Sequence, residues 1–172
     1  MAGTTETEPT RIMRVLGNLL VHVNQKMSAC TCSGLPWDRE ECPSGRAKLW
    51  AADIPEEFYK DFSELADLEE APVIEMLKFG EGDHIDLHKH LKTSSALLIP
   101  GRNSEECDLF SFEMFWLKEQ SSGELLFRRT KPYFIGPGIW HSVKRVGEGD
   151  HAYIFSASYP ELEGDLSWYA DE

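Results

Sequence analysis

After Pro72 the chain changes character, and this change limits the fold more than any other feature of the sequence. From Val73 onward, short apolar and β-branched runs alternate with turns rich in Gly, Pro and Asn. Short strands at this spacing are typical of an antiparallel sandwich or barrel. The sequence therefore predicts strands at residues 73–79, 84–90, 95–99, 109–118, 124–129, 133–135, 142–146 and 152–158.

The residues before this strand series predict helices and irregular chain. Thr10 is a candidate cap for a helix that runs to about Met27, and the apolar face of this helix would pack on the barrel or on a second subunit. Residues 28–47 predict irregular chain, and residues 53–68 predict short acidic helices. The predicted organisation is a disordered tail at 1–9, a helical and irregular extension packing on the barrel at 10–72, the barrel at 73–160 and an acidic C-terminal tail at 161–172.

The charge of the chain limits its partners. Its 172 residues carry 17 Lys and Arg against 30 Asp and Glu, a formal net charge of −13. This field repels nucleic acid and anionic membrane surfaces but attracts a metal cation. No segment reaches the roughly 20 apolar residues that span a bilayer. Polar Asn18 and His22 interrupt the one run that resembles a signal peptide, which favours a cytoplasmic protein.

Two histidines, His88 and His90, alternate within one predicted strand. Residues i and i+2 of a strand point to the same face, so the two imidazoles project together. Their separation suits adjacent positions on one metal ion, which neutral imidazole nitrogens bind readily. Such a pair is weak evidence when it stands alone.

A second segment, GPGIWH at residues 136–141, strengthens the metal interpretation. Pro has a fixed φ, and Gly tolerates left-handed conformations, so this segment predicts a stiff turn that presents His141 at the start of a strand. The two segments together predict a divalent metal site made of His88, His90 and His141.

These segments resemble the two motifs of the cupin superfamily, G-x5-H-x-H-x3-4-E-x6-G and G-x5-P-x-G-x2-H-x3-N. The resemblance covers about residues 73–158. It implies an all-β fold with N-terminal helices, in which a cupin jelly-roll-like antiparallel β-barrel encloses the metal ion. The matching positions are Gly82, His88, His90 and Gly101 in the first motif and Gly138 and His141 in the second.

Three positions depart from the cupin motifs. Ser94 or Ser95 stands where the family has its Glu ligand, Gly136 replaces the usual Pro, and Arg145 stands where Asn is common. Without the Glu, the ligand set is similar to the neutral three-histidine face of thiol and diketone dioxygenases. That similarity implies Fe(II) with open positions for substrate and O₂, with Mn, Ni or Zn as alternatives.

Several nearby residues are candidates for supporting roles. His84 and Asp86 share the alternation of the paired histidines, so Asp86 could replace the missing Glu or orient a ligand imidazole; alternatively, both are solvated at the barrel mouth. Glu113 and Tyr153 could act as acid or base, and Arg128 could pair with a substrate carboxylate.

The cysteines give a weaker indication. Cys30, Cys32 and Cys42 could bind zinc, but their spacing does not match the usual paired pattern, so free thiols are expected. Cys107 is expected to enter a strand. Four cysteines are too few and too unevenly placed for a secreted disulfide framework.

The leading functional hypothesis is a mononuclear non-heme Fe(II) dioxygenase that acts on a small organic substrate. A second hypothesis is a metal-dependent isomerase or lyase, in which Glu113 or Tyr153 moves the proton. A third is a non-catalytic cupin that binds a small ligand. Oxygen consumption separates the first two.

Overall fold

The computed structural model describes residues 6–27, 34–41, 44–100, 112–119, 121–126, 131–146, 151–160 and 164–171. Within these residues one helix precedes a sheet of eleven strands, in which all pairs are antiparallel. The elements are α1 (Glu8–Lys26), β1 (Asp38–Glu41), β2 (Ala47–Asp53), η1 (Glu56–Phe58), η2 (Ser63–Asp67), β3 (Val73–Phe79), β4 (His84–His90), β5 (Ser94–Leu98), β6 (Phe112–Lys118), β7 (Ser121–Leu126), β8 (Tyr133–Ile135), β9 (Trp140–Arg145), β10 (Ala152–Tyr159), β11 (Leu166–Trp168) and η4 (Tyr169–Asp171).

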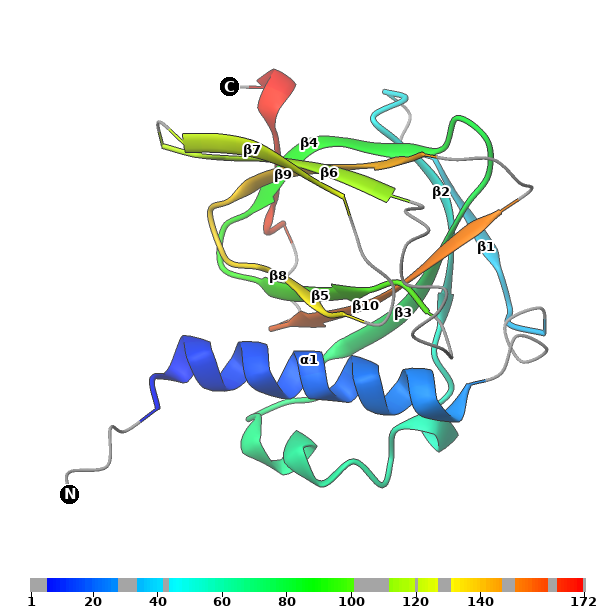
Figure 1. Cartoon of the computed structure of the whole chain (residues 1–172), viewed down its shortest axis with the longest axis vertical. Helices are drawn as coiled ribbons and strands as arrows, with labels where there is room; N and C mark the ends of the chain where they lie inside the picture. Colours follow the sequence, from blue (N-terminus) through cyan, green and yellow to red (C-terminus); the bar gives the residue numbers. More distant parts are fainter. Residues whose placement is uncertain are drawn as a thin grey trace.

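The sheet rolls into two facing layers (Figure 1). Its strand order is β7-β6-β9-β4-β2-β3-β10-β5-β8, with β1 on the edge of β2 and β11 on β4. One layer contains β7, β6, β9 and β4, the other contains β3, β10, β5 and β8, and β2 connects them. The predicted fold class, an antiparallel barrel with helical structure at its N-terminal end, is confirmed.

Apolar side chains fill two regions, one on each side of the layer that contains β3, β10, β5 and β8. Inside the barrel, the rings of Phe79 and Phe112 meet edge to face with centroids 5.1 Å apart. Outside it, α1 packs on β5 and β10 (Figure 1). Each fully buried Leu or Val contributes about 1.5–3 kcal/mol to that packing. The helix residues with no exposed surface are Val15, Leu16, Leu19, Leu20 and Val23.

The helix begins earlier than the sequence predicts. Its N-cap is Thr7 rather than Thr10, and a proline lies in its first turn, where a missing N–H costs no hydrogen bond. The predicted tail at 1–9 therefore overlaps the helix. The apolar face of α1 is covered by the sheet of the same chain, which is the first of the two alternatives that the sequence left open.

Two predicted boundaries also differ from the structure. The extension at 10–72 contributes β1 and β2 to the sheet, so the barrel does not begin at residue 73. The predicted acidic tail contains β11, which pairs with β4 at its histidines, Leu166 opposite His90 and Trp168 opposite His88. β1 and β11 have only four and three residues, which give little periodicity to detect, and the burial along β2 does not alternate strictly.

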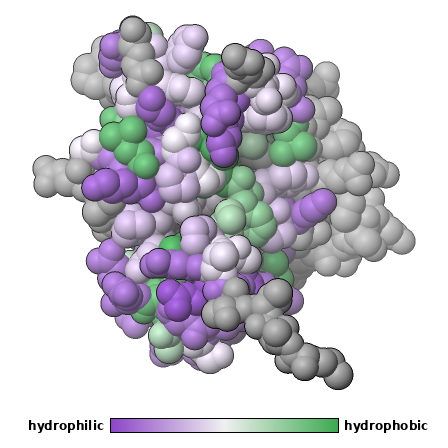
Figure 2. Space-filling view, turned by 90° about the vertical axis from the view of Figure 1, so that its left-hand side faces the viewer, coloured by the Kyte–Doolittle hydropathy of each residue, from purple (hydrophilic) through white to green (hydrophobic). Residues whose placement is uncertain are grey.

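The described surface is mixed in polarity. On the face shown in Figure 2, hydrophobic side chains form separate groups between hydrophilic ones. None of the helices in the described ranges is long and apolar enough to cross a bilayer.

Candidate metal centre

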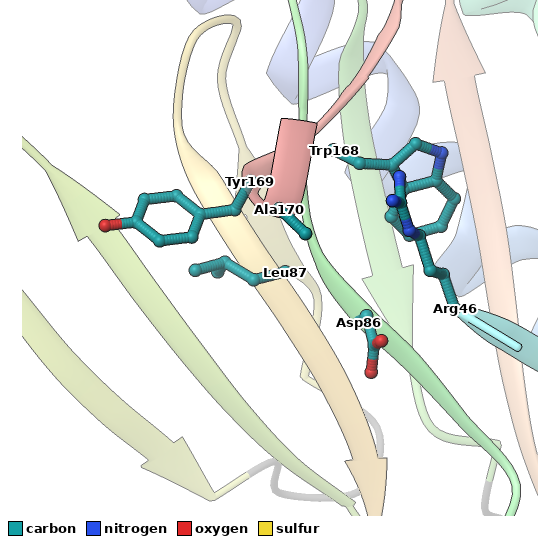
Figure 3. A pocket seen from close by; sticks show the side chains of 6 residues that line it. All are labelled: Arg46, Asp86, Leu87, Trp168, Tyr169 and Ala170. Atoms are coloured by element: carbon teal, nitrogen blue, oxygen red, sulfur yellow. The ribbon is translucent and has the colours of Figure 1, made fainter. Parts of the chain in front are cut away.

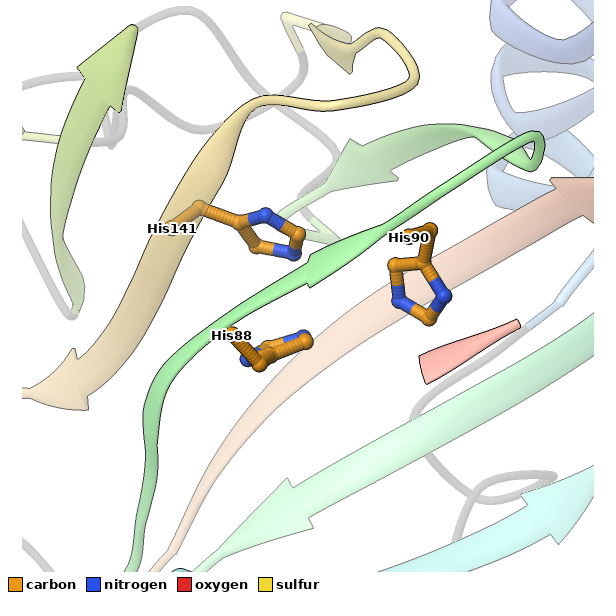
Figure 4. A group of neighbouring side chains, drawn as sticks. All are labelled: His88, His90 and His141. Carbon is orange, nitrogen blue, oxygen red and sulfur yellow. The ribbon is translucent and has the colours of Figure 1, made fainter. Parts of the chain in front are cut away.

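Neighbouring strands bring the three predicted histidines together. His88 on β4 pairs with His141 on β9, and His90 follows two residues later on the same strand. One ring nitrogen from each lies within 4.8 Å of the others. The ring centroids are 4.1 Å apart for His88 and His141, and 5.3 and 5.8 Å from His90 to these two (Figure 4). The spacing suits three ligands of one ion.

A β-bulge in β4 turns the histidines inward. The pairing of β4 with β9 shifts register between Ile85 and His88. Ile85 packs against the interior apolar cluster. His88 lies opposite His141, and His141 is on the same face of β9 as the core residue Val143. An extra residue in the bulge therefore lets both Ile85 and His88 face the interior, although they are three positions apart.

The bulge excludes His84 and Asp86 from the cluster. The side chain of Asp86 is 55% exposed and that of His84 is 35% exposed, with 3.6 Å between Nε2 of His84 and Oδ1 of Asp86. Of the two alternatives that the sequence left open for His84 and Asp86, their exposure favours solvated side chains. Asp86 instead lines a surface pocket of about 260 Å³ that none of the three histidines lines (Figure 3). Its lining residues are Arg46, Asp86, Leu87, Trp168, Tyr169 and Ala170.

Backbone carbonyls fix two of the imidazoles. Nδ1 of His88 lies 2.8 Å from the carbonyl oxygen of Asp86, and Nδ1 of His141 lies 3.0 Å from that of Ile139. A carbonyl oxygen accepts only, so each Nδ1 donates its proton and each Nε2 retains a lone pair. In this tautomer Nε2 of each ring can bind a metal ion.

Burial keeps the histidines uncharged. It lowers the pKa of His88 to about 3, with further lowering from the charges of His141 and His90. It also lowers the pKa of His141 to about 4, against the hydrogen bond to Ile139. The pKa of His90 is lowered by burial too, although the charge of Asp165 opposes the shift. At neutral pH the cluster offers three neutral imidazoles, the form that binds a divalent ion.

The glycine turn at residues 136–139 is tied to the histidine strand. Gly138 has φ +75°, a left-handed conformation that favours glycine, as the sequence predicts. Its N–H donates to the carbonyl oxygen of His90 at 2.7 Å. The turn that presents His141 is thus bonded to the residue that carries the second imidazole.

No carboxylate belongs to the three-histidine group within the described part of the chain. Ser94 and Ser95, which occupy the position of the missing Glu, are both buried. The hydroxyl of Ser95 lies 2.9 Å from that of Ser158 on β10. The ligand set that the described residues offer is neutral.

The candidate acid–base residues do not lie at this cluster. Glu113 lies on the face of β6 opposite to Phe112 and Met114, which are in the interior core. Tyr153 packs with the cluster beneath α1, its ring centroid 5.9 Å from that of Trp37. Arg128 lies outside the described residues, as do the four cysteines, Cys30, Cys32, Cys42 and Cys107.

Three residues near the cluster were not predicted from the sequence. The ring of Trp168 packs against that of His88 in a tilted arrangement, with 5.3 Å between the ring centroids. Oδ2 of Asp165 lies 4.0 Å from Nδ1 of His90. Trp116 pairs with His141 across β6 and β9, and a Cβ on Gly123 would lie 2.9 Å from its Nε1. None of the three offers a local signal, and Gly123 lies between the strands predicted at 109–118 and 124–129 rather than within one.

Comparison with solved structures identifies the architecture. The chain resembles a putative sugar phosphate isomerase from Acidithiobacillus ferrooxidans, with TM-score 0.52 and 11% identity over 84% of this chain and 81% of that one. It also resembles CapF solved with 3-isopropenyl-tropolone, an inhibitor, with TM-score 0.50 and 10% identity over 77% of this chain and 34% of that one. The fold is that of a cupin.

A further likeness, with TM-score 0.48 and 12% identity, is to oxalate oxidase in complex with the substrate analogue glycolate. The chain spans about half the length of that oxidase, 54%, and about a third of CapF, 34%. A scan against protein-family models and a search of curated proteins found no match. At these identities the likenesses describe the fold, and the function must be argued from the site.

Proposed function

We propose that this cupin is a metal-dependent enzyme, a mononuclear non-heme Fe(II) dioxygenase of a small organic substrate, with His88, His90 and His141 as the metal ligands. The observation that carries the proposal is the neutral cluster, in which two of the imidazoles have Nδ1 bonded to carbonyls and Nε2 available. Three such ligands suit Fe²⁺ and leave other positions on the ion open.

The neutral ligand set favours an anionic substrate. Because the imidazoles do not offset the +2 charge, an anionic oxygen or sulfur of the substrate is attracted to the site. A bound Fe(II) would pass electrons from the substrate to O₂, with both oxygen atoms entering the product. The residues of the chain hold this arrangement: the carbonyls of Asp86 and Ile139 orient the rings, and Trp168 shields His88.

The acid–base alternative has less support. An isomerase or lyase needs a residue that moves a proton within reach of the substrate. Glu113 and Tyr153 lie on strand faces turned away from the interior, and no other described carboxylate belongs to the cluster. Dioxygenation needs no such residue, because the ion and O₂ carry the chemistry.

Oxygen dependence tests the proposal. The protein is purified without an affinity tag and analysed for bound metals, then loaded anaerobically with Fe(II). Small thiols, catechols, hydroxy acids and diketones are screened for binding, and turnover is followed with an oxygen electrode after air is admitted. We expect about one O₂ consumed per substrate converted, and none in His88→Ala. Full turnover without oxygen would replace the dioxygenase with the isomerase or lyase.

A further inference from the structure

Asp165 is a buried carboxylate beside the three-histidine cluster. It comes directly before β11 and is only 7% exposed. Its carboxylate accepts hydrogen bonds from the backbone N–H groups of Lys92 and Thr93, each at 2.9 Å, and its carbonyl oxygen accepts one from Leu91 at 3.0 Å. These bonds fix the carboxylate next to the end of β4, where His90 lies.

His90 differs from the other two histidines in its surroundings. Nδ1 of both His88 and His141 meets a backbone carbonyl, whereas Nδ1 of His90 faces Oδ2 of Asp165 at 4.0 Å. In metal sites, the ring nitrogen that does not bind the ion almost always donates to a carboxylate, a carbonyl or water. Asp165 is the carboxylate that the structure places on this side of His90.

Asp165 can accept one more hydrogen bond. Oδ2 accepts the N–H of Thr93 at 2.9 Å, and the N–H of Lys92 is shared between Oδ1 at 2.9 Å and Oδ2 at 3.2 Å. A carboxylate offers about four acceptor sites, so these two backbone donors leave room for another donor. Burial raises the pKa of the Asp165 carboxyl, but hydrogen bonds from Thr93 and Lys92 outweigh this effect, so the pKa lies below its usual value.

We propose that Asp165 is a positioning residue for the metal centre: its carboxylate accepts a hydrogen bond from Nδ1–H of His90 and directs Nε2 toward the ion. The bond forms when the 4.0 Å separation closes to about 2.9 Å. Asp165 thereby places a carboxylate behind His90, in a site whose described ligands are neutral. This inference rests on the proposed metal site.

Metal affinity in a double-mutant cycle tests the assignment. Zn²⁺ affinity is measured by chelator competition for the wild type, Asp165→Asn, His90→Ala and the double variant. We expect Asp165→Asn to weaken binding about 10–100-fold in the wild type, as for other partners of ligand histidines, and less than threefold when His90 is already Ala. Asp61→Asn removes an equal charge from an exposed carboxylate that pairs with Lys26, outside the three-histidine group, and should change affinity less than threefold. Equal losses in both backgrounds would assign Asp165 a purely structural role and overturn the proposal.

A second measurement does not depend on how the variants fold. In Zn²⁺-loaded wild type, ¹⁵N-detected imidazole spectra should show His90 protonated at Nδ1 and metal-bound at Nε2, with a low-field proton that shifts upfield in Asp165→Asn. A His90 without a proton at Nδ1 would overturn the assignment. Zn²⁺ binding with wild-type affinity in Asp165→Asn would overturn this inference alone, whereas a wild type that binds no divalent ion would overturn the proposed function with it.

Discussion

The two halves of strand β4 each carry histidine, but the histidines differ in burial and in the hydrogen bonds of their ring nitrogens. Before the bulge, His84 is 35% exposed, and its Nδ1 and Nε2 lie 3.0 and 3.2 Å from the carbonyl oxygens of Gly82 and Gly45. After the bulge, His88 is only 6% exposed, and a carbonyl meets its Nδ1 alone. A metal site thus depends on which ring nitrogen the backbone leaves available, as well as on the presence of histidine.

The largest effect should come from His88→Ala. The total free energy of metal binding at structural sites in small domains is about 10–16 kcal/mol, shared among the ligands. Loss of one ligand of three should therefore lower divalent metal affinity at least ~1,000-fold, about 4 kcal/mol. His84→Ala is the matched control and should leave affinity within about threefold. Isothermal titration with Zn²⁺ measures both. A comparable loss in the two variants would mean that the halves of β4 do not differ as described.

The sequence could predict the second half of β4 better than the first. Alternation places His88 and His90 on one face, and a glycine turn supplies His141, because both patterns are local. The same alternation extended to His84 and Asp86 fails, because a bulge shifts the strand by one residue. The bulge is held by a distant contact, the N–H of Asp86 donating to the carbonyl of Arg46 at 2.7 Å, which no local pattern reveals.

The same reasoning explains Asp165. Its position beside His90 depends on the three-residue strand β11, which is too short to show periodicity and lies in a segment whose acidic composition favours a tail. The pairing that brings it to β4 joins residues more than 70 positions apart. Local sequence therefore identifies the ligand histidines, and only tertiary pairing identifies what holds them.

Acid should destabilise the metal-free protein through the second half of β4 and its partner on β9. In the unfolded chain, His88 and His141 bind protons below pH about 6.5, whereas in the folded protein they stay neutral until their pKa values of about 3 and 4. The unfolded state therefore binds more protons in this window, and stability falls as pH decreases from about 6.5 toward 4.

The expected loss is on the order of 5 kcal/mol, since each of the two histidines contributes over about two pH units and one unit corresponds to about 1.4 kcal/mol. Urea unfolding of the apo protein between pH 7.5 and 4.5 measures it. His141→Gln, which keeps a neutral polar side chain but does not titrate, should show a shallower pH dependence. The same slope in both proteins would contradict the assignment of the loss to the buried histidines.

Ile85→Ala tests the packing role of the first half. Ile85 is partly buried against the interior apolar cluster, and it is not a member of the three-histidine group. Truncation should cost about 2 kcal/mol of unfolding free energy, at the low end for such substitutions because the side chain is incompletely buried. Urea unfolding measures this cost, and Zn²⁺ affinity should remain within about threefold. A large loss of affinity would show that the bulge needs the Ile85 side chain.

The smallest effect should come from Asp86→Asn, which changes the side chain of the bulge residue and leaves its backbone bonds intact. The backbone of Asp86 does two tasks: its N–H donates to Arg46, and its carbonyl oxygen accepts from His88. Its side chain is 55% exposed and lies outside the three-histidine group. Asn preserves both backbone bonds, so stability should change by no more than about 0.5 kcal/mol, as for most surface substitutions. Metal content, measured by elemental analysis of the purified variant, should equal that of the wild type. Loss of the metal from a folded Asp86→Asn protein would make this carboxylate a ligand and would end the three-histidine assignment.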